Sequence, residues 1–251
     1  LYGGGDGIQL EYSSNNSITG NNIKDNWYGI WLDYSSDNFF YHNNFVNYAS
    51  QAGATTVCVN VWDDGYPSGG NYWSDHTGVD LYSGPYQNET GSDGIGDIPY
   101  TIYPNNTDGY PLTGSFTVFD AGTWNEVNYN VNIASNSTLS SFYFNPDEGA
   151  FIHFNVTESN GTTGFCRVAI PKQLLWVENR QWIVHVGNEP IVPTIAEDAN
   201  HTYFYFTYSH STKTIRITGT DAVPEFASAI ILPLFTALTL LTVIFKRRKN
   251  R

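Results

Sequence analysis

A DGIGD string that ends at Asp97 carries the residue types that bind hard cations. Calcium takes carboxylate and backbone carbonyl oxygens as ligands, and glycine allows the sharp turn that brings them together. Asp93, Asp97 and the Ile95 carbonyl are therefore candidate ligands of a Ca²⁺ ion. Glu89 would supply the first ligand of the loop. Gly91 stands where a carboxylate or amide is usual, so a loop held by main-chain hydrogen bonds is the alternative.

Two further carboxylates, Glu11 and Asp33, stand at equivalent positions of an internal repeat, where stacked strands would place them about 5 Å apart. Carboxylates that close can act as the pair of a retaining glycosidase. The repeat also produces like pairs by itself, so two solvated carboxylates are the alternative. Trp31 lies in the outward phase of the same strand, where an exposed ring can stack on a sugar. We expect these three residues to contact carbohydrate, and we assign no catalytic residue.

The repeat that positions these side chains is 22 residues long, and it aligns residues 7–28 with residues 29–50. The matched apolar positions are Ile8 with Ile30 and Leu10 with Leu32. Apolar and polar residues alternate within each copy, as in strands with one buried face. Paired Asn residues at the turns can form ladders from copy to copy. A stack of such short-strand coils is a parallel β-helix, so we predict parallel strands with the matched apolar side chains buried.

Aromatic residues gather after the second repeat copy, and Trp62 and Trp73 are among them. A repeat stack must end in a cap that covers its apolar interior. We expect these two rings and Tyr72 to form that cap, and exposed rings that stack on sugars are the alternative.

Charge is distributed unevenly along the chain. The formal net charge is −13, and five of the 11 Lys and Arg residues lie in the last six positions. The preceding part therefore carries 6 basic and 24 acidic residues, which is a net charge of −18. Such a surface repels phosphates, so we exclude nucleic acid as a partner.

The C-terminal segment, residues 223–251, has the pattern of a membrane anchor. Residues 226–245 form an uncharged run of 20 residues, long enough as a helix to cross ~30 Å of hydrocarbon. The KRRKNR cluster that follows satisfies the positive-inside rule. We therefore expect a single-pass protein of the cell membrane, with the C-terminus in the cytoplasm and the N-terminal part outside. Seven N-x-S/T sequons agree with an extracellular glycoprotein, and they are Asn15, Asn88, Asn105, Asn136, Asn155, Asn160 and Asn200.

Residues 115–222 lack the repeat and show short alternating segments separated by turn residues. This spacing is typical of a β-sandwich of immunoglobulin-like type. We therefore predict an all-β protein in three parts. Residues 1–114 form coils of a right-handed parallel β-helix and its cap, residues 115–222 form a β-sandwich spacer, and residues 223–251 form one transmembrane α-helix with a basic tail.

Two strings near the end of the repeats carry a family resemblance. They are NVWDDGYPSGGNYWSDHTGVD at residues 60–80 and DGIGDIPYTIYPNNTDGYPL at residues 93–112. With the repeats, they resemble NosD-type right-handed parallel β-helix proteins, and more closely archaeal surface proteins that carry this domain. A Pro-Glu-Phe motif at residues 224–226 resembles the PEF-type anchor of such proteins. The resemblance implies a carbohydrate- or surface-associated β-helix and, in some members, copper delivery.

The residue types of the chain argue against copper. Soft copper sites use Met, Cys and His, but the chain has no Met, and its six His residues are scattered. Cys58 and Cys166 lie in different predicted domains, and we expect two buried free thiols.

These patterns together predict a cell-surface protein, non-enzymatic, that serves adhesion or glycan contact. Carbohydrate or surface-layer components are the expected partners, besides the membrane. The alternative is a membrane-tethered polysaccharide lyase or hydrolase whose active site lies partly in further N-terminal coils. We expect such coils because the chain has no Met and opens without an apolar signal stretch.

Overall fold

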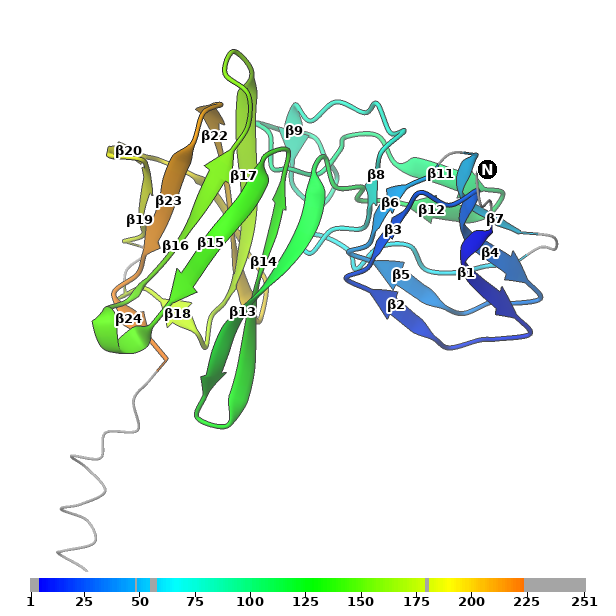
Figure 1. Ribbon diagram of the computed structural model, residues 1–251, viewed down its shortest axis with the longest axis horizontal. Helices are drawn as coiled ribbons and strands as arrows, with labels where there is room; N and C mark the ends of the chain where they lie inside the picture. Colours follow the sequence, from blue (N-terminus) through cyan, green and yellow to red (C-terminus); the bar gives the residue numbers. More distant parts are fainter. Residues whose placement is uncertain (1–4, 48, 55–57, 179–180, 224–251) are drawn as a thin grey trace, which may run out of the picture.

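The computed structural model describes residues 5–47, 49–54, 58–178 and 181–223. Regular structure in this part is almost entirely β-strand, and helical structure is limited to short 3-10 turns such as η1 (Pro146–Glu148). The prediction of an all-β protein is confirmed. Figure 1 shows two bodies side by side, short strands in blue to cyan and longer strands in green to orange. We call residues 5–112 the coil region and residues 115–223 the two-sheet region.

Strands of successive repeat copies pair in parallel in the coil region. The three parallel sheets have the orders β1-β4-β7, β2-β5 and β3-β6-β8. Their strands are β1 (Asp6–Glu11), β2 (Ser17–Thr19), β3 (Asn22–Lys24), β4 (Tyr28–Asp33), β5 (Phe39–Tyr41), β6 (Asn44–Val46), β7 (Ser50–Ala54) and β8 (Tyr72–Trp73). Two hairpins follow, β9 (Tyr82–Ser83) with β10 (Glu89–Thr90) and β11 (Tyr100–Tyr103) with β12 (Asn106–Asp108).

The register of the first parallel sheet is the one that the repeat predicts. Ile8 pairs with Ile30 and Leu10 with Leu32. The two residues of the second copy are fully buried, and those of the first copy are half-buried. The predicted parallel pairing at an offset of 22 residues is therefore confirmed.

Aromatic rings stack on one another in the interior of the coil region. Phe45 stacks on Trp73 with ring centroids 4.3 Å apart, and Trp73 stacks on Tyr100 at 4.4 Å. Phe40 stacks on Trp62 at 4.4 Å. Trp62 and Trp73 are each 1% exposed, and their indole N–H groups donate to residues of β12. Both rings are therefore part of the buried core of the coil region, and their role as a cap stays a prediction.

Asparagine side chains form ladders at the turns of the coils. At each step, a side-chain oxygen accepts the backbone N–H of the equivalent residue in the preceding coil, at 2.7–3.1 Å. One ladder runs through Asn16, Asn38, Asn60 and Asn106, a second runs through Asn21, Asn43, Asn71 and Asp108, and a third joins Asn26 to Asn47, whose own N–H donates to the Gln51 side chain. The ladders satisfy buried polar groups that would otherwise destabilise the stack.

Two five-stranded antiparallel sheets form the two-sheet region. Their orders are β13-β14-β17-β22-β21 and β15-β16-β23-β19-β20. The strands of these sheets are β13 (Ser115–Trp124), β14 (Val127–Ser135), β15 (Thr138–Phe144), β16 (Phe151–Thr157), β17 (Thr163–Pro171), β19 (Ile183–Val186), β20 (Glu189–Ile191), β21 (Thr194–Glu197), β22 (His201–Ser209) and β23 (Lys213–Thr218). A separate two-stranded sheet pairs β18 (Leu175–Trp176) with β24 (Asp221–Ala222). Side chains from both sheets share one core, with Val131, Phe154, Phe204 and Ile217 fully buried. The region thus has two layers, and its immunoglobulin-like type stays a prediction.

The two regions meet through a small apolar cluster. Ile95 and Leu112 come from the end of the coil region, and Phe116 and Ala134 come from β13 and β14. All four side chains are buried. The end of the coil region therefore packs against the β13-β14-β17-β22-β21 sheet.

Within the described ranges, no helix is long and apolar enough to cross a membrane. The predicted span at residues 226–245 and the anchor motif at residues 224–226 lie outside those ranges.

Candidate functional site

Outward-pointing residues of the β1-β4-β7 sheet form the surface that the repeat pattern singles out. Gln9 is in register with Trp31, Glu11 with Asp33, and Trp31 with Gly53. Equivalent positions of parallel strands point to the same side of a sheet. Glu11, Trp31 and Asp33 therefore share one face, opposite the buried Ile and Leu positions. We call this surface the sheet face.

Trp31 is half-buried on the sheet face. A Cβ atom added at Gly53 would lie 2.8 Å from the Trp31 ring, so the ring covers the backbone of β7 closely. The Tyr28 ring packs against it with centroids 4.7 Å apart. The ring is thereby held in place, and the rest of its surface stays open to solvent.

A stack of two tyrosines borders the sheet face, and the sequence analysis did not select it as a site. The rings of Tyr12 and Tyr34 are 4.9 Å apart and 2° from parallel. They are 72% and 58% exposed. Both residues have φ of 47°, in the left-handed region, where the chain turns out of its strand. The 22-residue offset already aligns them, and this alignment was the signal that could have revealed the stack.

The carboxylates of residues 93–97, which we call the acidic loop, accept hydrogen bonds from main-chain N–H groups. Asp97 accepts the N–H of Leu81 at 2.9 Å and that of Tyr82 at 3.1 Å. Asp93 accepts the N–H of Ile95 at 3.1 Å. Ile95 itself is fully buried in the apolar cluster between the two regions.

Asp80 adds a third carboxylate to this loop. It accepts the N–H of Asp93 at 3.0 Å and that of Gly94 at 2.8 Å. Burial raises the pKa of Asp80 to about 6, although these hydrogen bonds act in the opposite direction. Glu89 is exposed on the β9–β10 hairpin. No group of three or more His, Cys, Asp or Glu in the described part could hold a metal ion, and calcium binding by this loop stays a prediction.

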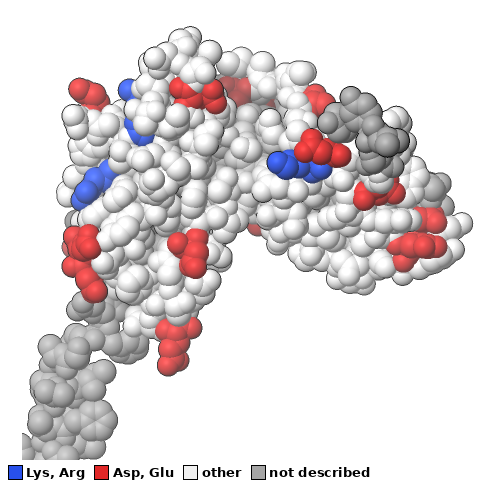
Figure 2. Space-filling view, in the orientation of Figure 1, with Lys and Arg blue, Asp and Glu red and all other residues white. Residues whose placement is uncertain are grey.

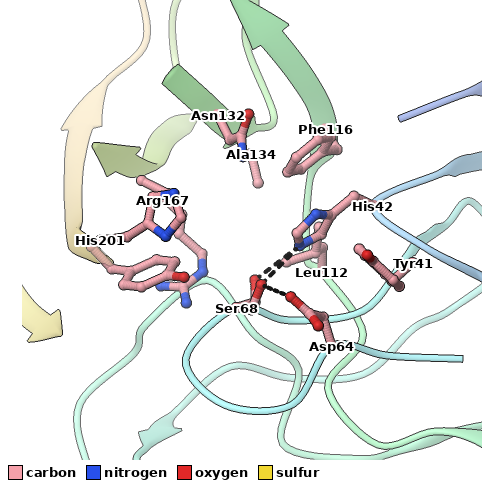
Figure 3. A pocket seen from close by; sticks show the side chains of 12 residues that line it. Tyr41, His42, Asp64, Ser68, Leu112, Phe116, Asn132, Ala134, Arg167 and His201 are labelled. Atoms are coloured by element: carbon pink, nitrogen blue, oxygen red, sulfur yellow. Dashed lines mark hydrogen bonds between the residues drawn. The ribbon is translucent and has the colours of Figure 1, made fainter. Parts of the chain in front are cut away.

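A cavity of about 230 Å³ lies where the coil region meets the two-sheet region, and we call it the junction pocket. Figure 3 shows His42 and Ser68 of the coil region across the hollow from Asn132, Arg167 and His201. No pattern in the sequence indicates this pocket, because its walls come from six separate segments of the chain.

Ser68, His42 and Asp64 have the residue types of a hydrolase triad but not its arrangement. The Ser68 hydroxyl donates to Asp64 at 2.7 Å, and it lies 3.4 Å from Nε2 of His42. In a triad the carboxylate binds and orients the imidazole, whereas here it binds the serine. Burial lowers the pKa of His42. This group therefore holds the loop against the coil and does not prepare a nucleophile.

Arg167 is a buried cation at the junction pocket. Arg167 is only 5% exposed. Its Nη1 group donates to the carbonyl of Asp93 at 3.1 Å, and Nη2 donates to the carbonyl of Pro67. The guanidinium carbon lies 4.9 Å from the centre of the Tyr203 ring. None of the ion pairs that the described residues form includes Arg167.

Cys58 and Cys166 are buried thiols that form no disulfide with each other, as predicted. Cys58 lies in the core of the coil region and Cys166 in that of the two-sheet region. Burial raises the pKa of Cys166 to about 11, so the group stays a neutral thiol at neutral pH. Copper prefers deprotonated thiolates, imidazoles and thioethers gathered in one place. The donors of the described residues do not fit that requirement.

Residues 2–78 match the model of the family described as Periplasmic copper-binding protein (NosD). No curated protein and no solved structure matches the chain. The matched segment contains the repeat copies. The match supports neither the predicted archaeal type nor the predicted PEF-type anchor. The coil-forming segment of this chain is therefore similar to NosD-type proteins through its repeats, although its described side chains do not form a copper site.

Proposed function

We propose that this chain is a non-enzymatic cell-surface protein that contacts glycans through the sheet face and the tyrosine stack. In this proposal the coil region is the C-terminal part of a right-handed parallel β-helix. The two-sheet region is an immunoglobulin-like spacer, and residues 223–251 anchor the chain in the membrane. The similarity of residues 2–78 to a family described as periplasmic supports a place outside the cytoplasm.

The observation that carries the proposal is the position of the tyrosine stack beside two carboxylates. Tyr12 directly follows Glu11, and Tyr34 directly follows Asp33. Exposed aromatic rings that contribute to a continuous surface mark sites of interaction. A sugar offers C–H faces that pack on such rings and hydroxyl groups that donate to carboxylates, which is the combination of apolar and polar groups that binding sites use.

The charge distribution supports a hydroxyl-rich partner. Figure 2 shows that most of the visible face lacks charged side chains, with separate acidic patches and few basic ones. Polyanions would find no extended basic surface on this face.

A glycan array probed with the full chain in detergent micelles tests the proposal. We expect binding to at least one glycan class, and loss of that binding in the double variant Tyr12→Ser/Tyr34→Ser. Tyr86→Ser is the matched control, because Tyr86 is 83% exposed and lies outside the sheet face. A double variant that binds as the unchanged protein does would refute the proposed surface.

The same array hits serve to examine the enzyme alternative. Each bound polysaccharide is incubated with the protein, and new reducing ends or unsaturated products are measured. If products form, and if Glu11→Gln or Asp33→Asn abolishes them, the protein is an enzyme that cleaves glycans at the sheet face. The proposal of a non-enzymatic protein would then be wrong.

A further inference from the structure

The junction pocket combines one buried positive charge with polar and aromatic walls. We propose that it binds one acidic monosaccharide, of the uronic acid class, with Arg167 as the contact for the sugar carboxylate. The site lies apart from the sheet face, so it does not depend on the proposed function.

The charge of Arg167 is the first argument. A buried guanidinium without a carboxylate partner is costly, because removal from water is offset only by well-placed counter-charges. Each terminal nitrogen of Arg167 donates one hydrogen bond to a backbone carbonyl. A guanidinium has five N–H donors, so these two bonds do not use all of them. The carboxylates of Asp93 and Asp80 act on Arg167 electrostatically, but neither forms an ion pair with it. A ligand carboxylate in the adjoining cavity would supply a direct ionic partner.

The size of the pocket is the second argument. Its volume is about 230 Å³, below the roughly 300–1,000 Å³ of sites that hold drug-sized molecules. A single sugar ring suits this space better than an oligosaccharide. The volume of the pocket therefore favours a terminal or free monosaccharide.

The walls of the pocket are the third argument. The His42 and Phe116 rings stack with centroids 4.4 Å apart and form an aromatic wall. Asn132, on the opposite wall, is partly exposed and offers an amide to hydroxyl groups. Asp64 is exposed at the edge of the pocket, where water screens its charge. The buried cation and the exposed acceptors would thus orient an acidic sugar with its carboxylate inward.

The acidic character of the whole protein does not prevent this binding. Charges more than about 8 Å apart at the surface are largely screened at physiological ionic strength. Among the charged residues that line the pocket, Arg167 is buried and Asp64 is exposed to water.

Isothermal titration calorimetry of the full chain in detergent micelles tests the proposal, with sodium glucuronate as the probe. Glucose, which lacks the carboxylate, and acetate, which lacks the ring, are the comparison ligands. We expect saturable binding of glucuronate at least about tenfold tighter than that of either comparison ligand, because only glucuronate forms the charge-assisted bonds and the ring contacts together. Equal binding of glucose, equal binding of acetate, or no glucuronate binding would each overturn the proposal.

Variants separate binding from folding. Asn132→Asp adds a carboxylate to the pocket wall at unchanged size and should weaken glucuronate binding at least about tenfold by repulsion. Asn188→Asp, in the exposed turn between β19 and β20, makes the same charge change outside the pocket and should leave binding unchanged. Arg167→Gln should abolish binding, and its melting temperature shows whether it is folded. The double variant Tyr12→Ser/Tyr34→Ser should retain glucuronate binding, even if the glycan array refutes the sheet face. If Asn132→Asp binds glucuronate as tightly as Asn188→Asp does, the pocket is not the site.

Discussion

The side chain of Asn44 makes two hydrogen bonds to the backbone of Phe116, which lies 72 residues further along the chain. Its amide nitrogen donates to the Phe116 carbonyl at 2.7 Å, and its oxygen accepts the Phe116 N–H at 2.6 Å. The amide thus takes the place of a neighbouring strand and joins the start of β6 to β13. Specific polar contacts, besides the apolar cluster, therefore set how the two regions meet.

Replacement of Asn44 should destabilise the protein. Asn44→Leu leaves the buried N–H and C=O groups of Phe116 without a partner, which costs about 1–3 kcal/mol per group. We expect the free energy of unfolding to fall by that amount or more in urea titrations. Asn188→Leu, at an exposed turn, should change it by less than about 0.5 kcal/mol. Equal stability of the two variants would show that the contact contributes nothing.

The repeat offers an internal comparison of two matched positions. Ile30 is fully buried, whereas Ile8, its partner in the preceding coil, is half-buried. Ile30→Ala should lower the free energy of unfolding by about 2–5 kcal/mol, because it leaves a cavity in a packed core. Ile8→Ala should cost clearly less, as chemical denaturation of both variants would reveal. The reverse order would contradict the burial of the second coil.

Stability should depend on pH through Asp108. Burial raises the pKa of this carboxyl from 3.8 to about 7, although it accepts hydrogen bonds from Asn71 and Trp73. Between about pH 4 and pH 7, the folded protein therefore holds a proton that the unfolded chain has released. The free energy of unfolding should fall as pH rises through this window.

Two variants check the assignment of this pH dependence. Asp108→Asn cannot ionise, so its stability should vary less with pH than that of the unchanged protein. Because the pKa of Asp80 is also raised, to about 6, the free energy of unfolding of Asp108→Asn should still fall slightly with pH in the lower part of the window. Asp147→Asn, at the exposed η1 turn, should keep the full slope. A slope that survives Asp108→Asn intact would assign the dependence to other groups.

The acidic loop allows a direct test of calcium. Because main-chain N–H groups already bind Asp93 and Asp97, we expect the melting temperature to be the same with calcium and with chelator. Asp97→Asn should destabilise the protein by about 1.5–3 kcal/mol in both solutions, through loss of charged hydrogen bonds. If calcium instead raises the melting temperature of the unchanged protein but not that of Asp97→Asn, the loop binds the ion.

Truncation after Val223 tests the anchor without removing a strand. β24 pairs with β18, and the Val223 N–H donates to the Leu174 carbonyl at 2.8 Å, so the truncated chain keeps both contacts. We expect the full chain to enter the detergent phase on phase separation and the truncated chain to stay in water. A full chain that stays in water would contradict the predicted span.

The sequence by itself determined the parallel register of the coils. Strand side chains alternate with a period of two, so a slip by one residue would expose every apolar position. The 22-residue offset is the one that stacks Ile8 on Ile30 and Leu10 on Leu32, and it also places Glu11, Trp31 and Asp33 on one face. These relations follow from a local, repeated pattern, and for that reason they could be predicted.

Only the tertiary structure decided the junction pocket and the state of Arg167. His42, Ser68, Asn132, Arg167 and His201 share no spacing or periodicity, and they meet because the coil region and the two-sheet region pack together. A single Arg in a strand normally keeps its charge in water. Its burial here depends on carbonyls from residues 74 and 100 positions away, and no local pattern in the sequence encodes contacts of that range.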